Sequence, residues 1–184
     1  VWQGQSYAEL TGHAKHYDWI IAAHEIEHTP DLIGFLLDCD SILKDDGVLS
    51  LVIPDKRYCF DHYRPLTGLA HILDSHWQHQ QMPTPGALTE QLLYAVANAG
   101  QIAWGHDHPA CYACVHTVEQ ARQAMQAQLH SPTYHDVHVW CFVPHAFRLL
   151  VHDLFQLGVI PFQEVDFFPT EAGEFFVALG RQGR

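Results

Sequence analysis

The sequence is poor in basic residues. Its 184 residues include 9 Lys and Arg against 21 Asp and Glu, a formal net charge of −12 at pH 7 with histidine neutral. Since binding to a nucleic-acid backbone depends on clustered Lys and Arg, this balance argues against a nucleic-acid partner. No apolar run approaches the roughly 18 residues of a membrane span, and no signal-peptide pattern is present. We therefore expect no nucleic-acid and no membrane partner.

Cysteine is scarce and odd in number, with five residues. They do not predict a disulfide framework, and a reducing cytoplasm is the expected location. Cys111 and Cys114 form a single C-x-x-C near further candidate ligands, namely His106, Asp107, His108 and His116. A zinc ribbon or finger would need a second such pair, so ordinary loop residues are the favoured interpretation and a structural zinc is the alternative.

Length and hydrophobic content suit a single domain over residues 1–184. A hydrophobic fraction of 48% is enough for one core. Histidine is abundant, with 16 residues, and we interpret most of them as surface residues. A homo-oligomer is left open by these features.

The most informative segment covers residues 17–55, YDWIIAAHEIEHTPDLIGFLLDCDSILKDDGVLSLVIPD. Its apolar runs at residues 19–23 and 48–53 predict two buried parallel strands. Between them, apolar residues at helical spacing predict a helix with Thr29 as its N-cap and Pro30 at its first position. A left-handed Gly47 is expected to close this helix. The segment thus predicts a right-handed strand–helix–strand unit in an α/β fold.

Residues 24–28, HEIEH, fit two zinc-protease patterns, H-E-x-x-H and H-x-x-E-H. The first pattern requires a helix, on which positions i and i+4 share a face. Here the cluster follows a predicted strand and precedes the predicted helix. We therefore place it in a loop, called the HEIEH loop below, at the carboxyl end of the strand, where open α/β sheets bind ligands. A metal-dependent hydrolase is the alternative.

With these elements in place, residues 17–55 resemble the fourth strand, fourth helix and fifth strand of class I S-adenosylmethionine-dependent methyltransferases. The resemblance rests on the apolar strand, the EH-x-PD loop, the LKDDG turn and the strand that ends at Pro54. Residues 136–180 resemble the end of the same fold, with a helix at 145–157 closed by Gly158 and strands at 162–168 and 174–179. The resemblance implies that these strands form an antiparallel hairpin at the sheet edge.

The main cofactor motif of this family is missing. Only sixteen residues precede Tyr17, and they contain no G-x-G. We therefore expect the C-terminal half of a Rossmann-like methyltransferase sheet, mostly parallel, which is inactive alone and leaves the strand at residues 19–23 unpaired at its edge. The resemblance implies S-adenosylmethionine as the cofactor of a longer parent protein, in contact with Ala23, His24 and Glu25.

Two chemistries are open for the HEIEH loop. Some methyltransferases carry E-x-x-E-H there and bind a divalent ion, and the chain matches Glu27 and His28 with His24 in place of the first Glu. A nitrogen at that position would shift the preference from magnesium toward zinc, iron, nickel or manganese. His62 or His138 is the candidate fourth ligand. Alternatively, His28 or His24 is a general base, or only bonds the cofactor or backbone.

Residues 56–133 are expected to form a mostly helical insertion that acts as a lid or substrate wall. Thr117 and Gln120 predict a capping box for its last helix. The expected helices are residues 68–81, 88–99 and 118–129.

The start of this insertion and a later extended run supply candidate substrate contacts. The run PDKRYCFDHYRPLT resembles one bacterial methyltransferase branch, and Asp61, His62 and Arg64 are its candidates. A structural Asp61–Arg64 ion pair is the alternative. On the strand-like residues 137–143, His138 and Trp140 share a face by period two and are also candidates. The alternative for these two residues is structural: Trp140 belongs to the core, and His138 caps the end of the sheet.

The predicted function is methyl transfer by the parent protein from S-adenosylmethionine to an oxygen or nitrogen of a small or sugar-like acceptor. The catalytic candidates are His28 and His24, and positioning of the reactants supplies most of the rate. A non-catalytic binding or scaffolding relative that lost the cofactor half is the second class.

Overall fold

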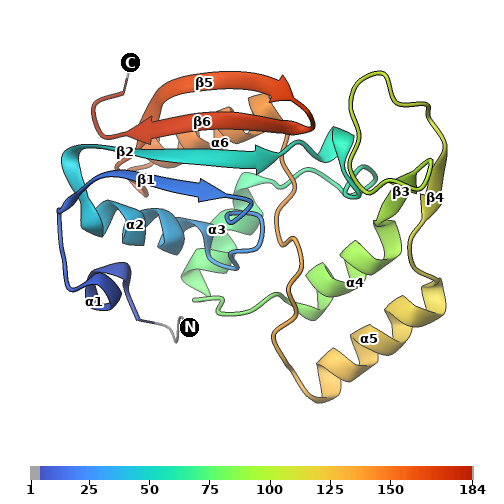
Figure 1. Ribbon diagram of the computed structural model, residues 1–184. Coiled ribbons are helices and arrows are strands. Elements are labelled where there is room, and N and C mark those ends of the chain that lie inside the picture. The colour runs from blue at the N-terminus through green and yellow to red at the C-terminus, as the bar shows by residue number, and fades with distance from the viewer. Residues whose placement is uncertain (1–4, 184) are drawn as a thin grey trace.

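The computed structural model describes residues 5–183 and has an α/β architecture with a mixed sheet (Figure 1). The sheet has four strands in the order β1-β2-β6-β5. Strands β1 and β2 are parallel, whereas β6 is antiparallel to both of its neighbours. The strand bounds are β1 Tyr17–Ala23, β2 Leu43–Pro54, β5 Gln163–Glu171 and β6 Glu174–Gly180.

One face of this sheet carries the core. Alternate residues of β2 and β6 are 0–2% exposed, and they pack with helices α2 (Leu32–Ile42) and α6 (Pro144–Gln156) in one hydrophobic cluster. Successive strand residues point to opposite faces, so one face takes the whole set. These strand residues are Leu49, Leu51, Ile53, Phe175, Val177 and Leu179.

Strand β1 is parallel to β2, as expected, but the prediction that it is buried is wrong. Trp19 is 62% and Ile21 is 73% exposed. Among the described residues β1 pairs with β2 alone, and the face that carries Trp19 and Ile21 is left open. The expected unpaired edge is therefore confirmed, with Ala22 on the core face.

Two details of the strand–helix–strand unit correct the sequence analysis. Helix α2 begins after Asp31, whose carboxylate accepts the Gly34 N–H at 2.8 Å, while the Thr29 hydroxyl donates to the Glu25 carbonyl. Gly47 lies inside β2 and is not left-handed. A side chain at Gly47 would come within 2.9 Å of Leu43 and 3.1 Å of the Tyr17 carbonyl, so close packing explains this glycine.

The last helix and the terminal hairpin match the expectation. Helix α6 ends before Gly158, which has φ 70°, and β5 and β6 form the antiparallel hairpin at the sheet edge. Its turn contains Ala172 and Gly173, both with positive φ. The expected strand at residues 137–143 is instead an extended segment with one bridge, between Phe142 and Asp55.

The stretch at 56–133 contains helices and a small hairpin. The capping box of Thr117 and Gln120 is confirmed at α5, whereas the expected helix over 88–99 is wrong at its end, because Val96–Asn98 forms strand β3. Strand β3 pairs with β4, Tyr112–Cys114. The helices are η1 Lys56–Tyr58, α3 Leu69–Trp77, α4 Pro85–Tyr94 and α5 Val118–His130, and a short α1, Tyr7–Thr11, precedes the sheet. Within residues 5–183, no helix is long and apolar enough to cross a membrane.

The contrast between the two sheet faces gives a prediction for stability. Leu51→Ala should lower the free energy of unfolding by about 2–5 kcal/mol, because it leaves a cavity in the core. Ile21→Ala should change it by less than about 1 kcal/mol, because that side chain is 73% exposed. Urea denaturation followed by circular dichroism measures both values, and equal losses would contradict this account of the sheet.

Candidate functional site

The HEIEH loop leaves the carboxyl end of β1 as a turn and not as a helix. His24 has a positive φ of 51°, and its Nε2 lies 2.6 Å from a carboxylate oxygen of Glu174. The two histidines therefore do not share a helical face, which is what H-E-x-x-H needs to bind zinc. The loop therefore differs from the helical H-E-x-x-H arrangement of zinc proteases.

A different set of donors brings two residues of this loop together with one from the extended segment before α6. Glu27, His28 and His138 each offer one ligand atom, and these three atoms lie within 4.8 Å of one another. We call these residues the donor triad. The backbone builds it: the Glu27 carbonyl accepts the N–H groups of Val139 at 2.6 Å and Trp140 at 3.2 Å. The rings of His28 and His138 meet edge to face, with centroids 4.6 Å apart.

Glu27 is the least satisfied member of the triad. Its side chain is 2% exposed, and neither carboxylate oxygen has a hydrogen-bond partner among the described residues. The nearest ionic contact is His24 Nδ1, 3.5 Å from Oε1. Burial raises the pKa of Glu27 above its ordinary value. A buried carboxylate without a donor is costly, and a bound cation would offset that cost.

The second residue, His28, is partly buried. Its Nδ1 lies 2.8 Å from a carboxylate oxygen of the exposed Asp136, but the contact lacks the angles of a hydrogen bond. Ionic attraction applies there only when His28 carries a proton. Neutral His28 therefore keeps a ring nitrogen for a metal ion.

The third residue, His138, is held from several sides. Its Nδ1 is 2.5 Å from Asp61 Oδ2, and its backbone N–H donates to Gln91 Oε1 on α4 at 2.6 Å. The Phe60 ring lies against the imidazole, with centroids 4.7 Å apart. Because Asp61 occupies Nδ1, Nε2 is the nitrogen left for a ligand.

Asp61 and Arg64 form a buried ion pair, with Arg64 Nη1 2.9 Å from Asp61 Oδ1 and both side chains at most 2% exposed. Burial alone would raise the pKa of Asp61. The hydrogen bond and charge of His138, and then Arg64, outweigh it and hold that pKa below its ordinary value. The structure thus has the ion pair given as the alternative, and neither residue presents surface to a substrate.

The other candidates lie outside the triad. Ala23, His24 and Glu25 are exposed at the end of β1, and His24 lies against the triad through its Nδ1, 3.5 Å from Glu27 Oε1. His62 is turned away: its Nδ1 bonds the Arg57 carbonyl at 2.8 Å. Trp140 is 1% exposed and donates its indole N–H to the Thr29 carbonyl, so it is a core residue, as the alternative held.

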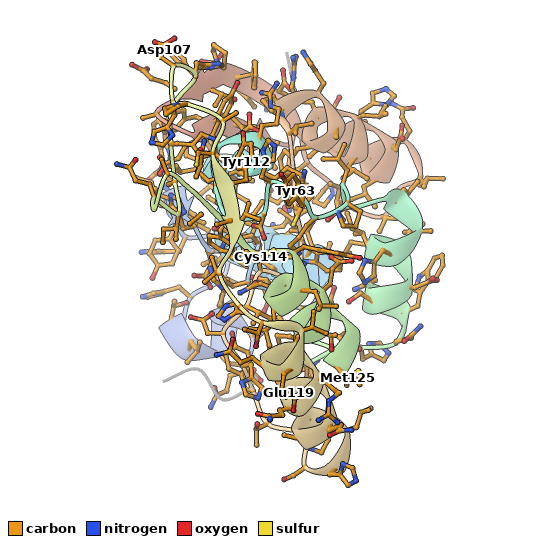
Figure 2. All side chains as sticks on the ribbon, turned by 90° about the vertical axis from the view of Figure 1, so that its right-hand side faces the viewer. Tyr63, Asp107, Tyr112, Cys114, Glu119 and Met125 are labelled. Atoms are coloured by element: carbon orange, nitrogen blue, oxygen red, sulfur yellow. The ribbon has the colours of Figure 1, made fainter. Side chains whose placement is uncertain are left out.

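His62 belongs to an aromatic group on the outer side of its loop. It stacks on Tyr112, with centroids 4.6 Å apart and planes at 14°. Figure 2 shows Tyr63 beside Tyr112, with Cys114 further along β4. Cys111 and Cys114 are exposed free thiols, and the donor triad is the one metal-type group within residues 5–183.

The donor set suits a transition metal. Two imidazoles and one carboxylate favour zinc, iron, manganese, cobalt or nickel, whereas magnesium prefers oxygen ligands and water. Metal–ligand distances of about 2.0–2.2 Å place tetrahedral donors about 3.4 Å apart. The donor atoms of the triad all lie within 4.8 Å of one another, a spacing that one ion could bridge.

Comparisons with protein-family models, with curated proteins and with solved structures found no match to this chain. The geometry of the donor triad and the order of the sheet are therefore the grounds for a functional proposal.

The unpartnered Glu27 predicts an unusual mutant phenotype. In metal-free protein at pH 7, Glu27→Gln should raise the free energy of unfolding by about 1–3 kcal/mol, because it removes a buried charge without donors. The folded state raises this pKa from its ordinary 4.5, so ionised Glu27 destabilises the protein. That loss grows as pH rises above about 4.5, and the gain from the variant should vanish below it.

Urea denaturation between pH 4 and pH 8 measures this difference. Glu25→Gln is the matched control, because Glu25 is an exposed carboxylate in the same loop, and it should show no such gain. A Glu27→Gln variant that is less stable than wild type at pH 7 would contradict an unpartnered carboxylate.

Proposed function

We propose that this chain is the C-terminal portion of a class I S-adenosylmethionine-dependent methyltransferase, and that the donor triad binds a divalent transition-metal ion in its acceptor site. The single observation that carries the metal site is the buried, unpartnered carboxylate of Glu27 beside two imidazoles. The sheet supports the assignment to the family. The resemblance implied a parallel pair followed by an antiparallel edge hairpin, and the observed sheet has both.

The position of the triad suits a transfer reaction. It lies just beyond the carboxyl end of β1, the edge at which open α/β sheets bind ligands. A metal ion bound there would lower the pKa of an acceptor hydroxyl at neutral pH. Glu27, His28 and His138 would hold and orient the acceptor through that ion, and orientation supplies most of the rate in methyl transfer.

The cofactor has its own place in the proposal. Ala23, His24 and Glu25 are exposed along the end of the edge strand β1, where the resemblance puts cofactor contacts. The Gly-rich turn of the family would come from strands that precede β1 in a parent protein. We therefore expect this chain alone to bind S-adenosylmethionine weakly or not at all. The acceptor is a small or sugar-like molecule with a hydroxyl or amine.

Metal binding is tested on the purified, chelator-treated chain by titration with Zn²⁺ or Co²⁺ in a calorimeter. We expect one tight site, which His138→Gln weakens beyond the roughly 10–100-fold seen when a supporting residue is lost. His152→Gln is the matched control, because His152 is an exposed histidine of α6, and it should leave the tight site unchanged. The same affinity in His138→Gln as in wild type would overturn the metal site.

Methyl transfer is tested separately, on a longer protein that carries the natural sequence upstream of Val1. Titration with S-adenosylmethionine should give a saturable heat, because binding orders the cofactor against the end of β1. The variant His152→Gln, far from this edge in sequence and on helix α6, is again the control. No heat at high protein concentration would exclude the enzyme and leave the non-catalytic binding class.

A further inference from the structure

We propose that Asp61 is a positioning residue of the metal site, which fixes the proton of His138 on Nδ1 and so leaves the lone pair of Nε2 as the donor that His138 contributes to the triad. The inference rests on the proposed function, because it names the group that prepares one of the three metal ligands. A neutral imidazole carries one N–H, and the hydrogen bond of one nitrogen decides which nitrogen can bind a metal.

Both oxygens of Asp61 have fixed partners. Oδ2 accepts from His138 Nδ1 at 2.5 Å, and Oδ1 accepts from Arg64 Nη1 at 2.9 Å. Asp61 and Arg64 are each 2% exposed, so water has little access to replace either bond. An ionised carboxylate only accepts, so both bonds point toward Asp61, and Nδ1 of His138 must carry the N–H.

Helix α4 contributes two further contacts to the Arg64–Asp61–His138 series of hydrogen bonds. Arg64 Nε donates to Glu90 Oε1 at 3.2 Å, and the next residue, Gln91, accepts the backbone N–H of His138 at 2.6 Å. Two consecutive residues of α4 thus hold the guanidinium and the backbone of the ligand. Ligand orientation is therefore tied to the docking of α4, although α4 contributes no member of the triad.

Asparagine at position 61 separates this role from a purely structural one. The Asn side chain has nearly the size of Asp but only one oxygen. Arg64 has donors only and claims that oxygen, so the amide NH₂ must face His138. His138 Nδ1 must then accept, its proton moves to Nε2, and Nε2 can no longer bind a metal without losing that proton. The packing of the fold is expected to stay the same, but the nitrogen of His138 that is free of a proton is then Nδ1 and not Nε2.

The first measurement is zinc affinity, by competition with a chromophoric chelator. Asp61→Asn should bind Zn²⁺ about 10- to 100-fold more weakly than wild type, the range for loss of a supporting carboxylate. Glu119→Gln is the matched control. Glu119 is an exposed carboxylate on α5 that bonds Arg122 and Gln123, outside the Asp61–His138 network, so zinc affinity should stay within about twofold of wild type.

The second measurement needs no metal. Long-range ¹H–¹⁵N correlation of the metal-free protein reports the tautomer of each neutral histidine, and the His138→Gln spectrum identifies the signals of His138. Wild type and Glu119→Gln should show the Nδ1–H form, and Asp61→Asn should show the Nε2–H form. A structural role for Asp61 would leave this tautomer unchanged.

The two readouts distinguish the failures. Wild type that binds no zinc but shows the tautomer change would refute the metal site and retain the positioning by Asp61. Asp61→Asn that keeps the Nδ1–H form would overturn the inference, whatever its zinc affinity. If Asp61→Asn does not fold, the double variant Asp61→Asn with Arg64→Met is tested in its place. Without Arg64 the Asn oxygen is free to accept from Nδ1–H of His138, so the double variant should keep the Nδ1–H form. Loss of that form would equally overturn the inference.

Discussion

The backbone carbonyl of Glu27 is the junction on which the candidate site depends. By accepting the N–H groups of Val139 and Trp140, it joins the loop after β1 to the extended segment that returns from α5 toward the sheet (Figure 1). This pairing brings His138 against His28 and buries the Glu27 carboxylate between them without a donor. These backbone hydrogen bonds thus bury the Glu27 carboxylate without a hydrogen-bond partner among the described residues. An unsatisfied buried group of this kind calls for an explanation such as an ion or a functional role.

Around this junction, the supporting contacts come from residues that are not themselves members of the donor triad. Asp61 follows η1, Arg64 follows in the same loop, and Gln91 lies on α4, yet all three act on His138 directly or through one neighbour. Preorganisation of this kind lowers the entropy lost when a ligand set closes around an ion. Residues of the stretch at 56–133 therefore hold His138, a member of the triad, in place.

Local patterns predicted the strand–helix–strand unit and the α5 capping box, because each depends on neighbours in sequence. The terminal hairpin was implied by the family resemblance. The exposed face of β1 was missed, since an apolar run such as Trp19–Ile21 reads as buried when the strands beside it are not known. All three residues of the triad were candidates from the sequence: Glu27 and His28 in the HEIEH loop, and His138 as one of two possible fourth ligands. His24, the remaining candidate, bonds Glu174 and is not in the triad. The Asp61–His138 bond spans 77 positions, and no local pattern encodes it.

The central claim is that Glu27, His28 and His138 bind one transition-metal ion. X-ray absorption of the zinc-loaded protein tests it most directly, because zinc–sulfur and zinc–nitrogen or oxygen distances differ, at about 2.3 Å and about 2.0–2.1 Å. The account predicts a first shell of nitrogen and oxygen only, with the outer-shell scattering of two imidazoles, and loss of one imidazole in His138→Gln. A sulfur shell from the exposed Cys111 and Cys114, or an unchanged spectrum in that variant, would contradict it.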